Sequence, residues 1–114
     1  MALDLFAEMS VSDYPGALKW YEQLLGAAPV MYPNDIEAVF ELAEHQYLVV
    51  EHRPDHAGHG QVTIFVGDFD DRVTAITERG LEPALRETYD NGVRKFIYKD
   101  PDGNEIGFGG GPAD

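Results

Sequence analysis

The sequence predicts an α+β domain in which two βαβββ modules, related by a pseudo-twofold axis, form a curved mixed sheet around a cleft. Three observations predict it. The 114 residues suit a single domain, 1–114, and are too few for two independent cores. The two halves repeat the same order of apolar runs, helix signals and glycine stops. A DPDG turn at residues 100–103 precedes a last apolar run.

The internal repeat divides the chain into module 1, about 1–55, and module 2, about 56–114. EMSVSDYPGALKWYEQLLGAAP occupies residues 8–29, and TIFVGDFDDRVTAITERGLEP occupies residues 63–83. Each segment contains an apolar run, an Asp near a helix start, an amphipathic stretch, a glycine and a proline. One such half cannot cover both faces of its own sheet, so we expect the two halves to form one fold.

The first helix follows Asp13. Pro15 suits the first turn, where a missing N–H costs little, and Gly26 suits the left-handed residue that ends a helix. The spacing of apolar residues between them predicts one buried stripe, made of Ala17, Trp20, Tyr21, Leu24 and Leu25.

The second helix follows Asp68. Asp68 and Asp71 favour a helix N-terminus because negative charge is stabilised there, and Gly80 ends the helix. Its expected buried stripe is weaker than that of the first helix and consists of Phe69, Val73 and Ile76.

Three strands are expected after each helix. In module 1, Glu44 and His45 form a plausible turn, and in module 2 the DPDG turn separates the last two strands because its Gly permits a positive φ. The segment HRPDHAGHG, residues 52–60, links the modules. The expected strands cover residues 30–32, 37–43 and 46–52, then 84–88, 93–99 and 104–109.

The composition is strongly acidic, with 21 Asp and Glu against 8 Lys and Arg and a formal net charge of −13. Such a field repels nucleic acid and anionic membranes and favours cationic or neutral ligands. The alternative is that the charge only maintains solubility, since the acids are spread along the chain. No run approaches the roughly 18 apolar residues of a membrane span, and no secretory signal is recognised. We expect a cytoplasmic protein.

The cysteine and histidine usage argues against the common reactive sites. The chain has no cysteine, which excludes disulfides, thiolate metal sites and a Cys nucleophile. His52, His56 and His59 lie close in sequence, but Pro54 prevents a regular helix from gathering their imidazoles. No G-x-S-x-G elbow and no phosphate-binding loop occur. We therefore expect no catalytic residue, no metal and no cofactor.

The paired βαβββ halves, VSDYPGALKWYEQLLG and DPDGNEIGF resemble the vicinal oxygen chelate superfamily over nearly the whole chain. That superfamily includes glyoxalase I, extradiol dioxygenases, fosfomycin-modifying enzymes and the metal-free bleomycin-binding resistance proteins. The resemblance is specific for the fold and says little about the reaction.

In metal-dependent members of this superfamily, the ligands come from the first and last strands of each half. The repeat places these positions at Phe6, Gln61, Glu51 and Gly107. A catalytic divalent ion needs about three protein ligands, but Glu51 alone is a good one and Gln61 is a weak one. We expect that no metal is held there, and that Gly107 leaves room in the cleft.

Several residues are candidates for ligand contact on the cleft face. Alternation places Tyr47 and Glu51 on one face, where Glu51 either meets a ligand or simply points to water at a strand end. Glu8 shares the face of Phe6, so it binds ligand, pairs with Arg94 or lies at a dimer contact. Gln61 and Thr63 offer hydrogen bonds from the corresponding strand of module 2.

An aromatic pair completes the predicted site. Arg94, Phe96 and Tyr98 alternate along one strand and are expected to share a face. On the cleft side, Phe96 and Tyr98 would bind a flat molecule, whereas on the other side they would be core.

The sequence thus favours a metal-independent protein that binds a small organic molecule and resembles the bleomycin-resistance type. The ligand is expected to be cationic or neutral, and the resemblance implies a homodimer. The alternative is a metal-dependent lyase, isomerase or dioxygenase of the glyoxalase type with a non-standard ligand set. A third alternative is an interaction domain whose own side chains fill the cleft.

Overall fold

The computed structural model describes residues 3–113 and contains two modules, each with four strands and one α-helix. Module 1 runs from the first strand to the end of the fourth. Its elements are β1 (Leu5–Val11), α1 (Tyr14–Leu25), β2 (Met31–Asn34), β3 (Glu37–Ala43) and β4 (Gln46–His52).

Module 2 repeats this order after a short 3₁₀ helix, η1 (Pro54–His56), in the linker. Its elements are β5 (Gln61–Phe65), α2 (Phe69–Glu78), β6 (Leu85–Thr88), β7 (Arg94–Lys99) and β8 (Glu105–Gly110). The predicted strands of residues 37–43 and 46–52 have the bounds expected from the sequence, and the other four differ by one or two residues at an end.

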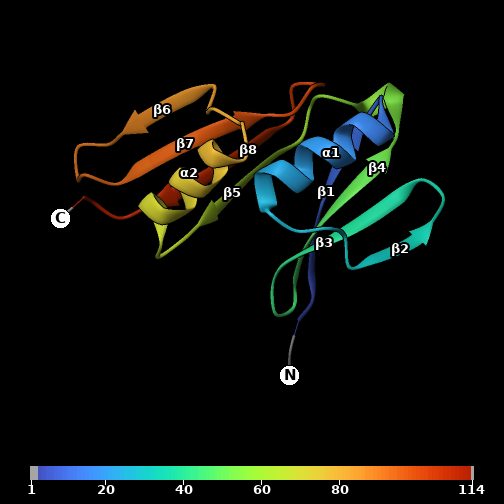
Figure 1. The fold of residues 1–114 in the computed structure, drawn as a ribbon, viewed down its shortest axis with the longest axis horizontal. Coiled ribbons are helices and arrows are strands. Elements are labelled where there is room, and N and C mark those ends of the chain that lie inside the picture. The colour runs from blue at the N-terminus through green and yellow to red at the C-terminus, as the bar shows by residue number, and fades with distance from the viewer. Residues whose placement is uncertain (1–2, 114) are drawn as a thin grey trace.

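Each module forms one sheet, with the strand orders β1-β4-β3-β2 and β5-β8-β7-β6. The first and last strands of a module, β1 with β4 and β5 with β8, are parallel, and the remaining pairs are antiparallel. Figure 1 shows the two sheets side by side, with α1 and α2 both on the viewer's side. The predicted α+β class and the two βαβββ modules are confirmed.

The helix ends follow local chemistry. The side chain of Asp13 accepts a hydrogen bond from the Gly16 N–H at 3.2 Å, which satisfies a donor that the first turn of α1 leaves open. Gly26 ends α1 with φ 73°, and Gly80 follows α2 with φ 98°. Both are left-handed conformations that glycine adopts without a steric penalty, as the sequence predicted.

The core lies between the helices and the sheets. The helices contribute Ala17, Tyr21 and Leu24 from α1, and Phe69 and Ile76 from α2, all of which are buried. They belong to the predicted stripes, of which Trp20, Leu25 and Val73 are only partly buried. From the sheets the core receives Met9, Val11, Phe40, Leu48, Val50, Tyr98, Ile106 and Phe108.

A buried polar network joins the modules. The hydroxyl of Tyr21 in α1 donates to Asp100 Oδ2 at 2.7 Å, and the Asn104 side-chain amide donates to the same oxygen at 2.8 Å. That amide also donates to the Ser10 carbonyl at 2.8 Å, while the Gly60 N–H donates to Asn104 Oδ1 at 2.7 Å. The DPDGN turn therefore fixes the β7–β8 end of module 2 against β1 and α1.

A second contact joins the two helices. The Arg79 guanidinium at the end of α2 donates to the Leu24 carbonyl at 3.0 Å, and the Gln23 side-chain amide donates to the Arg79 carbonyl at 3.0 Å. The first bond satisfies a carbonyl that the last turn of α1 leaves open, and the second satisfies the carbonyl of the residue that caps α2. Within residues 3–113, no helix is both long and apolar enough to span a membrane.

Candidate functional site

Each sheet has one side covered by its helix and a second side, here called the free face, on which no helix packs. In module 1, Phe40 contacts Tyr21 of α1, so alternation places the neighbouring strand positions on the free face. The free face of module 1 carries Phe6, Glu8, Ser10, Glu37, Val39, Glu41, Tyr47, Val49 and Glu51. The structure thus places four of the predicted site residues, Phe6, Glu8, Tyr47 and Glu51, on one surface.

In module 2, Phe108 lies under Arg72 of α2, which identifies the helix side of that sheet. The register of β5, β7 and β8 then determines the opposite side. The free face of module 2 carries charged residues of both signs together with polar, apolar and glycine positions: Gln61, Thr63, Phe65, Leu85, Glu87, Lys95, Ile97, Lys99, Glu105, Gly107 and Gly109. Three predicted site residues, Gln61, Thr63 and Gly107, are among them.

The predicted placement of Phe96 and Tyr98 on the cleft side is wrong. They share a face with Arg94, as expected, but it is the helix side. Phe96 makes an edge-to-face contact with Phe69 of α2 at a centroid distance of 5.0 Å, and Tyr98 is 0% exposed. Alternation along β7 gives the two faces correctly, but only packing against α2 decides which one is buried.

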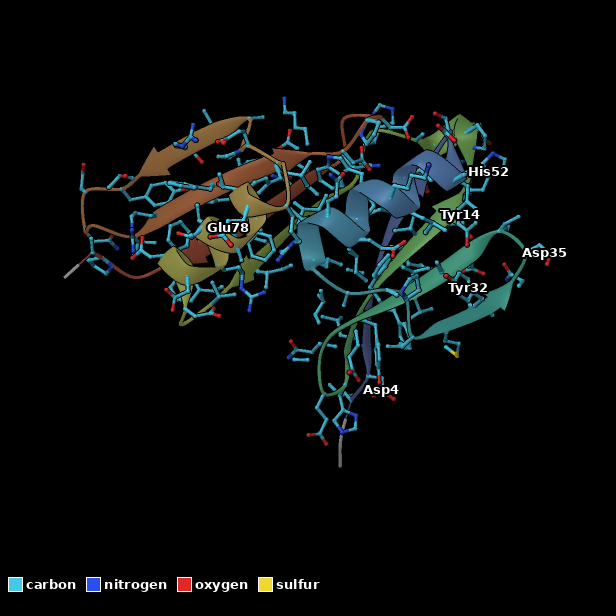
Figure 2. The ribbon with its side chains drawn as sticks, in the orientation of Figure 1. Asp4, Tyr14, Tyr32, Asp35, His52 and Glu78 are labelled. Atoms are coloured by element: carbon cyan, nitrogen blue, oxygen red, sulfur yellow. The ribbon has the colours of Figure 1, made fainter. Side chains whose placement is uncertain are left out.

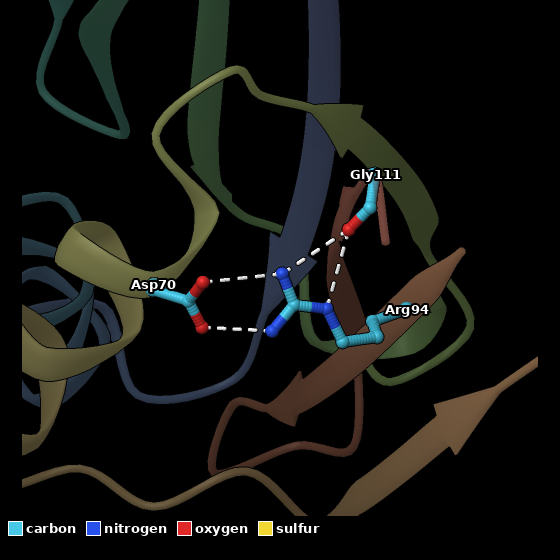
Figure 3. Close-up of polar contacts among 3 residues, drawn as sticks. All are labelled: Asp70, Arg94 and Gly111. Atoms are coloured by element: carbon cyan, nitrogen blue, oxygen red, sulfur yellow. Dashed lines mark hydrogen bonds and ion pairs between the residues drawn. The ribbon is translucent and has the colours of Figure 1, made fainter. Parts of the chain in front are cut away.

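Arg94 is engaged on the helix side and does not pair with Glu8. Its guanidinium donates to both carboxylate oxygens of Asp70, at 2.7 and 3.2 Å, and to the Gly111 carbonyl at 3.1 Å, as Figure 3 shows. The hydrogen bond from Arg94 lowers the pKa of the Asp70 carboxyl below its usual value. A cavity of about 350 Å³ adjoins this pair, but the charge of Arg94 is already neutralised there.

The free face of module 1 presents a stacked aromatic pair. The rings of Phe6 and Tyr47 are 4.8 Å apart and 16° from parallel. Phe6 is 47% exposed, although apolar side chains of this size are usually more buried. The pair offers a flat apolar surface of the kind on which a planar ligand can stack.

Two glutamates lie beside this pair, and two more lie at the other end of the same face, beyond Val39 and Val49. Glu41 lies opposite Tyr47 in the register, Glu51 lies opposite both Ser10 and Glu37, and Glu8 lies two residues from Phe6. Among the described residues, none forms an ion pair with Glu8, Glu41 or Glu51. The surface is therefore aromatic at one end, with carboxylates beside the pair and at the opposite end.

Gly107 does not leave an open space, contrary to the expectation. A Cβ atom at this position would stand 2.9 Å from Lys95 Cε and 3.5 Å from Thr63 Oγ1. The Lys95 side chain thus lies across β8 where a larger residue would otherwise project. At Gly109 the Phe65 ring plays the same part, with Cδ2 at 3.1 Å from such a Cβ. Glycine is needed here for close approach.

Two cavities lie along the seam between the modules. One of about 170 Å³ is lined by Leu5 and Tyr47 from module 1 and by Thr63 and Phe65 from module 2. Another of about 250 Å³ lies nearer the helices, beside Leu25 and Arg72. The first adjoins the free faces of both modules and is the natural place for a small ligand.

The residues at the family's metal positions do not fit a divalent ion. Phe6 is stacked on Tyr47, and Gly107 is covered by Lys95, whose ammonium repels a cation. Glu51 and Gly107 also do not occupy equivalent positions in the two modules. Glu51 lies opposite Ser10, whereas Gly107 lies opposite Thr63, and the residue of module 1 that corresponds to Thr63 is Glu8. Within residues 3–113, no group of three or more His, Asp or Glu could hold a metal.

The histidines do not form a site. His45 lies in the β3–β4 turn with φ 65°, and its Nδ1 is 2.7 Å from Asp4 Oδ1. His52 ends β4, and His56 ends η1, a single 3₁₀ turn that begins at Pro54. The acidic residues are likewise spread over the surface: Figure 2 labels the exposed Asp4, Asp35 and Glu78 at three separated places.

Sequence reasoning missed Lys95, Glu37 and Glu41. Alternation along β3 places Glu37 and Glu41 on one face together with the apolar Val39, so the sequence pattern did not mark that face as exposed. For Lys95 the signal lay in two glycines of β8, which predict close approach by a neighbouring strand.

The two βαβββ modules and their free faces define an α+β fold of paired modules. A family model for the Glyoxalase/Bleomycin resistance protein/Dioxygenase superfamily matches residues 3–108, and the chain belongs to that superfamily. No curated protein matches the chain.

Solved structures agree with this assignment. A glyoxalase/bleomycin resistance protein from Catenulispora acidiphila is similar at 50% identity and TM-score 0.94, over 97% of this chain and 100% of that one. A lactoylglutathione lyase from Agrobacterium tumefaciens matches at 18% identity and TM-score 0.76, over 97% and 95%. The oxidase ChaP-H1 matches at 24% identity and TM-score 0.71, over 98% and 97%. The last two show a common fold alone.

Proposed function

We propose that this protein binds a small organic molecule on its free faces, at the seam between the modules, without a metal ion. One observation carries the proposal: the exposed Phe6–Tyr47 stack adjoins a cavity lined by both modules, while the positions for metal ligands hold an aromatic ring and a glycine. Binding alone requires no acid, base or metal, so a receptor or sequestering protein suits this surface.

The charges of the surface support a ligand that is cationic or neutral overall. The free face of module 1 holds Glu8, Glu37, Glu41 and Glu51 and no basic residue. A planar ligand would stack on the aromatic pair, and a positive group at its edge would meet a carboxylate. The location of Phe96 and Tyr98 on the helix side speaks against a cleft filled by its own aromatic residues.

We also propose a homodimer. Phe6 and Phe65, on the free faces, are 47 and 67% exposed, and a second copy packed beside the seam would shield them while leaving the rest of the free faces open. Light scattering behind a size-exclusion column tests this directly. A mass of one chain at micromolar concentration contradicts the dimer and leaves the binding proposal intact.

The decisive experiment measures metal and binding together. Protein purified without an affinity tag is analysed for zinc, nickel, manganese and iron, and is then titrated with 2-naphthylmethylammonium, a flat cation. We expect substoichiometric metal and saturable binding. A stoichiometric metal that is required for binding would overturn the proposal and favour the glyoxalase-type enzyme.

Glu51→Ala tests the role of the acidic face. We expect about threefold weaker binding of 2-naphthylmethylammonium, since a partly exposed charge pair contributes little, and an almost unchanged Tm. Glu78→Ala is the control, because Glu78 lies on the exposed side of α2 and removes the same charge. Equal effects of both variants, or a collapse of stability in Glu51→Ala, contradict a ligand-binding role for Glu51.

A further inference from the structure

We propose that Lys95 is a ligand-binding residue of module 2 and that it binds a carboxylate or other oxyanion at one end of a flat ligand. This inference rests on the proposed function and deepens it, since it says which chemical group the ligand presents to module 2. A ligand that is neutral overall then carries charges of both signs.

The position of Lys95 is built into the sheet. It lies on β7, half-buried on the free face, opposite Gly109 of β8. Its Cε lies 2.9 Å from where a Cβ at Gly107 would stand, so its side chain crosses β8 and approaches β5. Two glycines on the free side of β8 make this path possible, because any side chain at residue 107 would displace the lysine.

The groups next to the Lys95 ammonium favour an oxyanion. The Thr63 hydroxyl oxygen is 3.5 Å from the same point above Gly107, and Gln61 precedes it on the same face of β5. An ammonium, a hydroxyl and an amide can all donate hydrogen bonds to a carboxylate. Hydrogen bonds from a charged donor to such an acceptor are the strong ones.

Lys95 has no counter-ion in the described part of the chain. Arg72, Arg86 and Arg94 each pair with a carboxylate, at 3.3, 3.1 and 2.7 Å. Among residues 3–113, none forms an ion pair or hydrogen bond with Lys95, although the protein carries 21 acidic residues. Glu87 lies opposite Lys95 on β6, but its carboxylate accepts a hydrogen bond from the Tyr89 hydroxyl at 3.4 Å.

The Lys95 corner adjoins the aromatic surface through Thr63. Thr63 lies against Gly107 and also lines the seam cavity of about 170 Å³ together with Tyr47. A flat molecule lying along this seam would place one end over Lys95 and its body near Tyr47. The free face of module 1 carries four glutamates and no basic residue, whereas that of module 2 carries two lysines and two glutamates, so an oxyanion is less strongly repelled at the module 2 end.

Three probes with one ring system test the inference: 2-naphthoate, 2-naphthylmethanol and 2-naphthylmethylammonium, titrated by calorimetry. In Lys95→Met we expect about tenfold weaker binding of 2-naphthoate, because a charge-assisted hydrogen bond is lost. Binding of 2-naphthylmethanol should be unchanged. The difference between these two probes isolates the charge from the flat surface.

Two further variants provide the controls. Lys99→Met removes the same charge from the same free face, at an exposed position beside Glu105, and should change 2-naphthoate binding less than twofold. Gly107→Ala displaces the Lys95 side chain without removing it, and should weaken 2-naphthoate several-fold. In the Lys95→Met background, Gly107→Ala should then add nothing, because the two changes act on one interaction.

The outcomes separate the two proposals. If 2-naphthylmethanol or 2-naphthylmethylammonium binds but Lys95→Met leaves 2-naphthoate unaffected, the role of Lys95 is wrong and the binding function stands. If Lys95→Met changes the mass in solution instead of 2-naphthoate affinity, Lys95 serves a contact between copies and the inference is overturned. If none of the three probes binds wild-type protein, the proposed function fails and this inference with it.

Discussion

The two modules share their strand order and helix placement, yet their free faces differ. Module 1 presents an aromatic pair and four glutamates without a basic residue, whereas module 2 presents two lysines and two glutamates together with hydroxyl and amide groups and glycines. On the helix side both modules present large apolar residues. The comparison teaches that packing against a helix restricts one side of each sheet, while the other side can take the chemistry that a ligand requires.

The two modules also differ in the core, where each has one buried tyrosine whose hydroxyl is bonded differently. Tyr21 in module 1 and Tyr98 in module 2 are both 0% exposed. The Tyr21 hydroxyl donates to Asp100 at 2.7 Å, whereas within the described residues the Tyr98 hydroxyl has no hydrogen-bond partner. Substitutions on the helix side should therefore have large and unequal effects, and those on the free faces small ones.

Asp100→Ala should have the largest effect. Asp100 is 4% exposed, and its loss leaves the Tyr21 hydroxyl and the Asn104 amide without their acceptor. We expect a loss of about 3 kcal/mol in the free energy of unfolding, measured by urea denaturation. Asp100→Asn keeps one oxygen acceptor and should lose less. A loss below about 1 kcal/mol for Asp100→Ala would show that the junction contributes little.

Alkaline pH should destabilise the protein through the same tyrosine. Burial, followed by the nearby Asp100 charge, raises the pKa of Tyr21 well above 10.0, its value in an unfolded chain. Below that value both states hold the proton and the contribution is complete. Above it the unfolded state releases the proton and the folded state retains it, so stability falls by up to about 1.4 kcal/mol per pH unit.

The measurement is urea denaturation at several pH values between about 9 and 11.5. Burial also raises the pKa of Tyr98, so both residues act in the same direction. Tyr21→Phe should show a shallower decline than wild type, since Lys and Arg titrate equally in both proteins. Parallel declines would mean that Tyr21 does not retain its proton in the folded state.

The two tyrosines should respond oppositely to loss of the hydroxyl at neutral pH. Tyr21→Phe loses a hydrogen bond to a charged acceptor and should cost about 1.5 kcal/mol. Tyr98→Phe removes a hydroxyl that has no partner and should be neutral or stabilise by up to about 1 kcal/mol. Equal losses in both variants would indicate that a buried water satisfies Tyr98.

Phe6→Ser should have the smallest effect on stability. Phe6 is 47% exposed and contacts Tyr47 on a face that no helix covers. We expect the free energy of unfolding to change by no more than about 0.5 kcal/mol, while binding of 2-naphthylmethanol weakens. A loss as large as that of a core residue would show that the aromatic pair is structural.

The fold could be predicted from the sequence because its signals are local. Asp13, Gly26, Gly80 and the DPDG turn each require a particular backbone conformation, and the repeat allowed one half to check the other. The expected strand 30–32 differs from β2 at both ends, by two residues at its end, because the four residues of β2 are all exposed and give no apolar alternation.

The candidate site could be predicted only in part. Alternation grouped Phe6 with Glu8 and Tyr47 with Glu51 correctly, since a strand permits only two faces. Which face of β7 meets a helix depends on contacts with a distant segment, so Phe96 and Tyr98 were misplaced. The path of Lys95 across Gly107 likewise arises from three strands brought together by the fold.

The DPDGN turn has a consequence for how a molecule reaches the seam. Asp100 and Asn104 bind α1, β1 and the linker at once, and these hydrogen bonds oppose a hinge opening between the modules. A ligand would then enter and leave the seam from the free faces of the sheets. The residence time of the ligand would depend on its contacts with the side chains of the free faces, and no slow gating motion of the backbone would be needed.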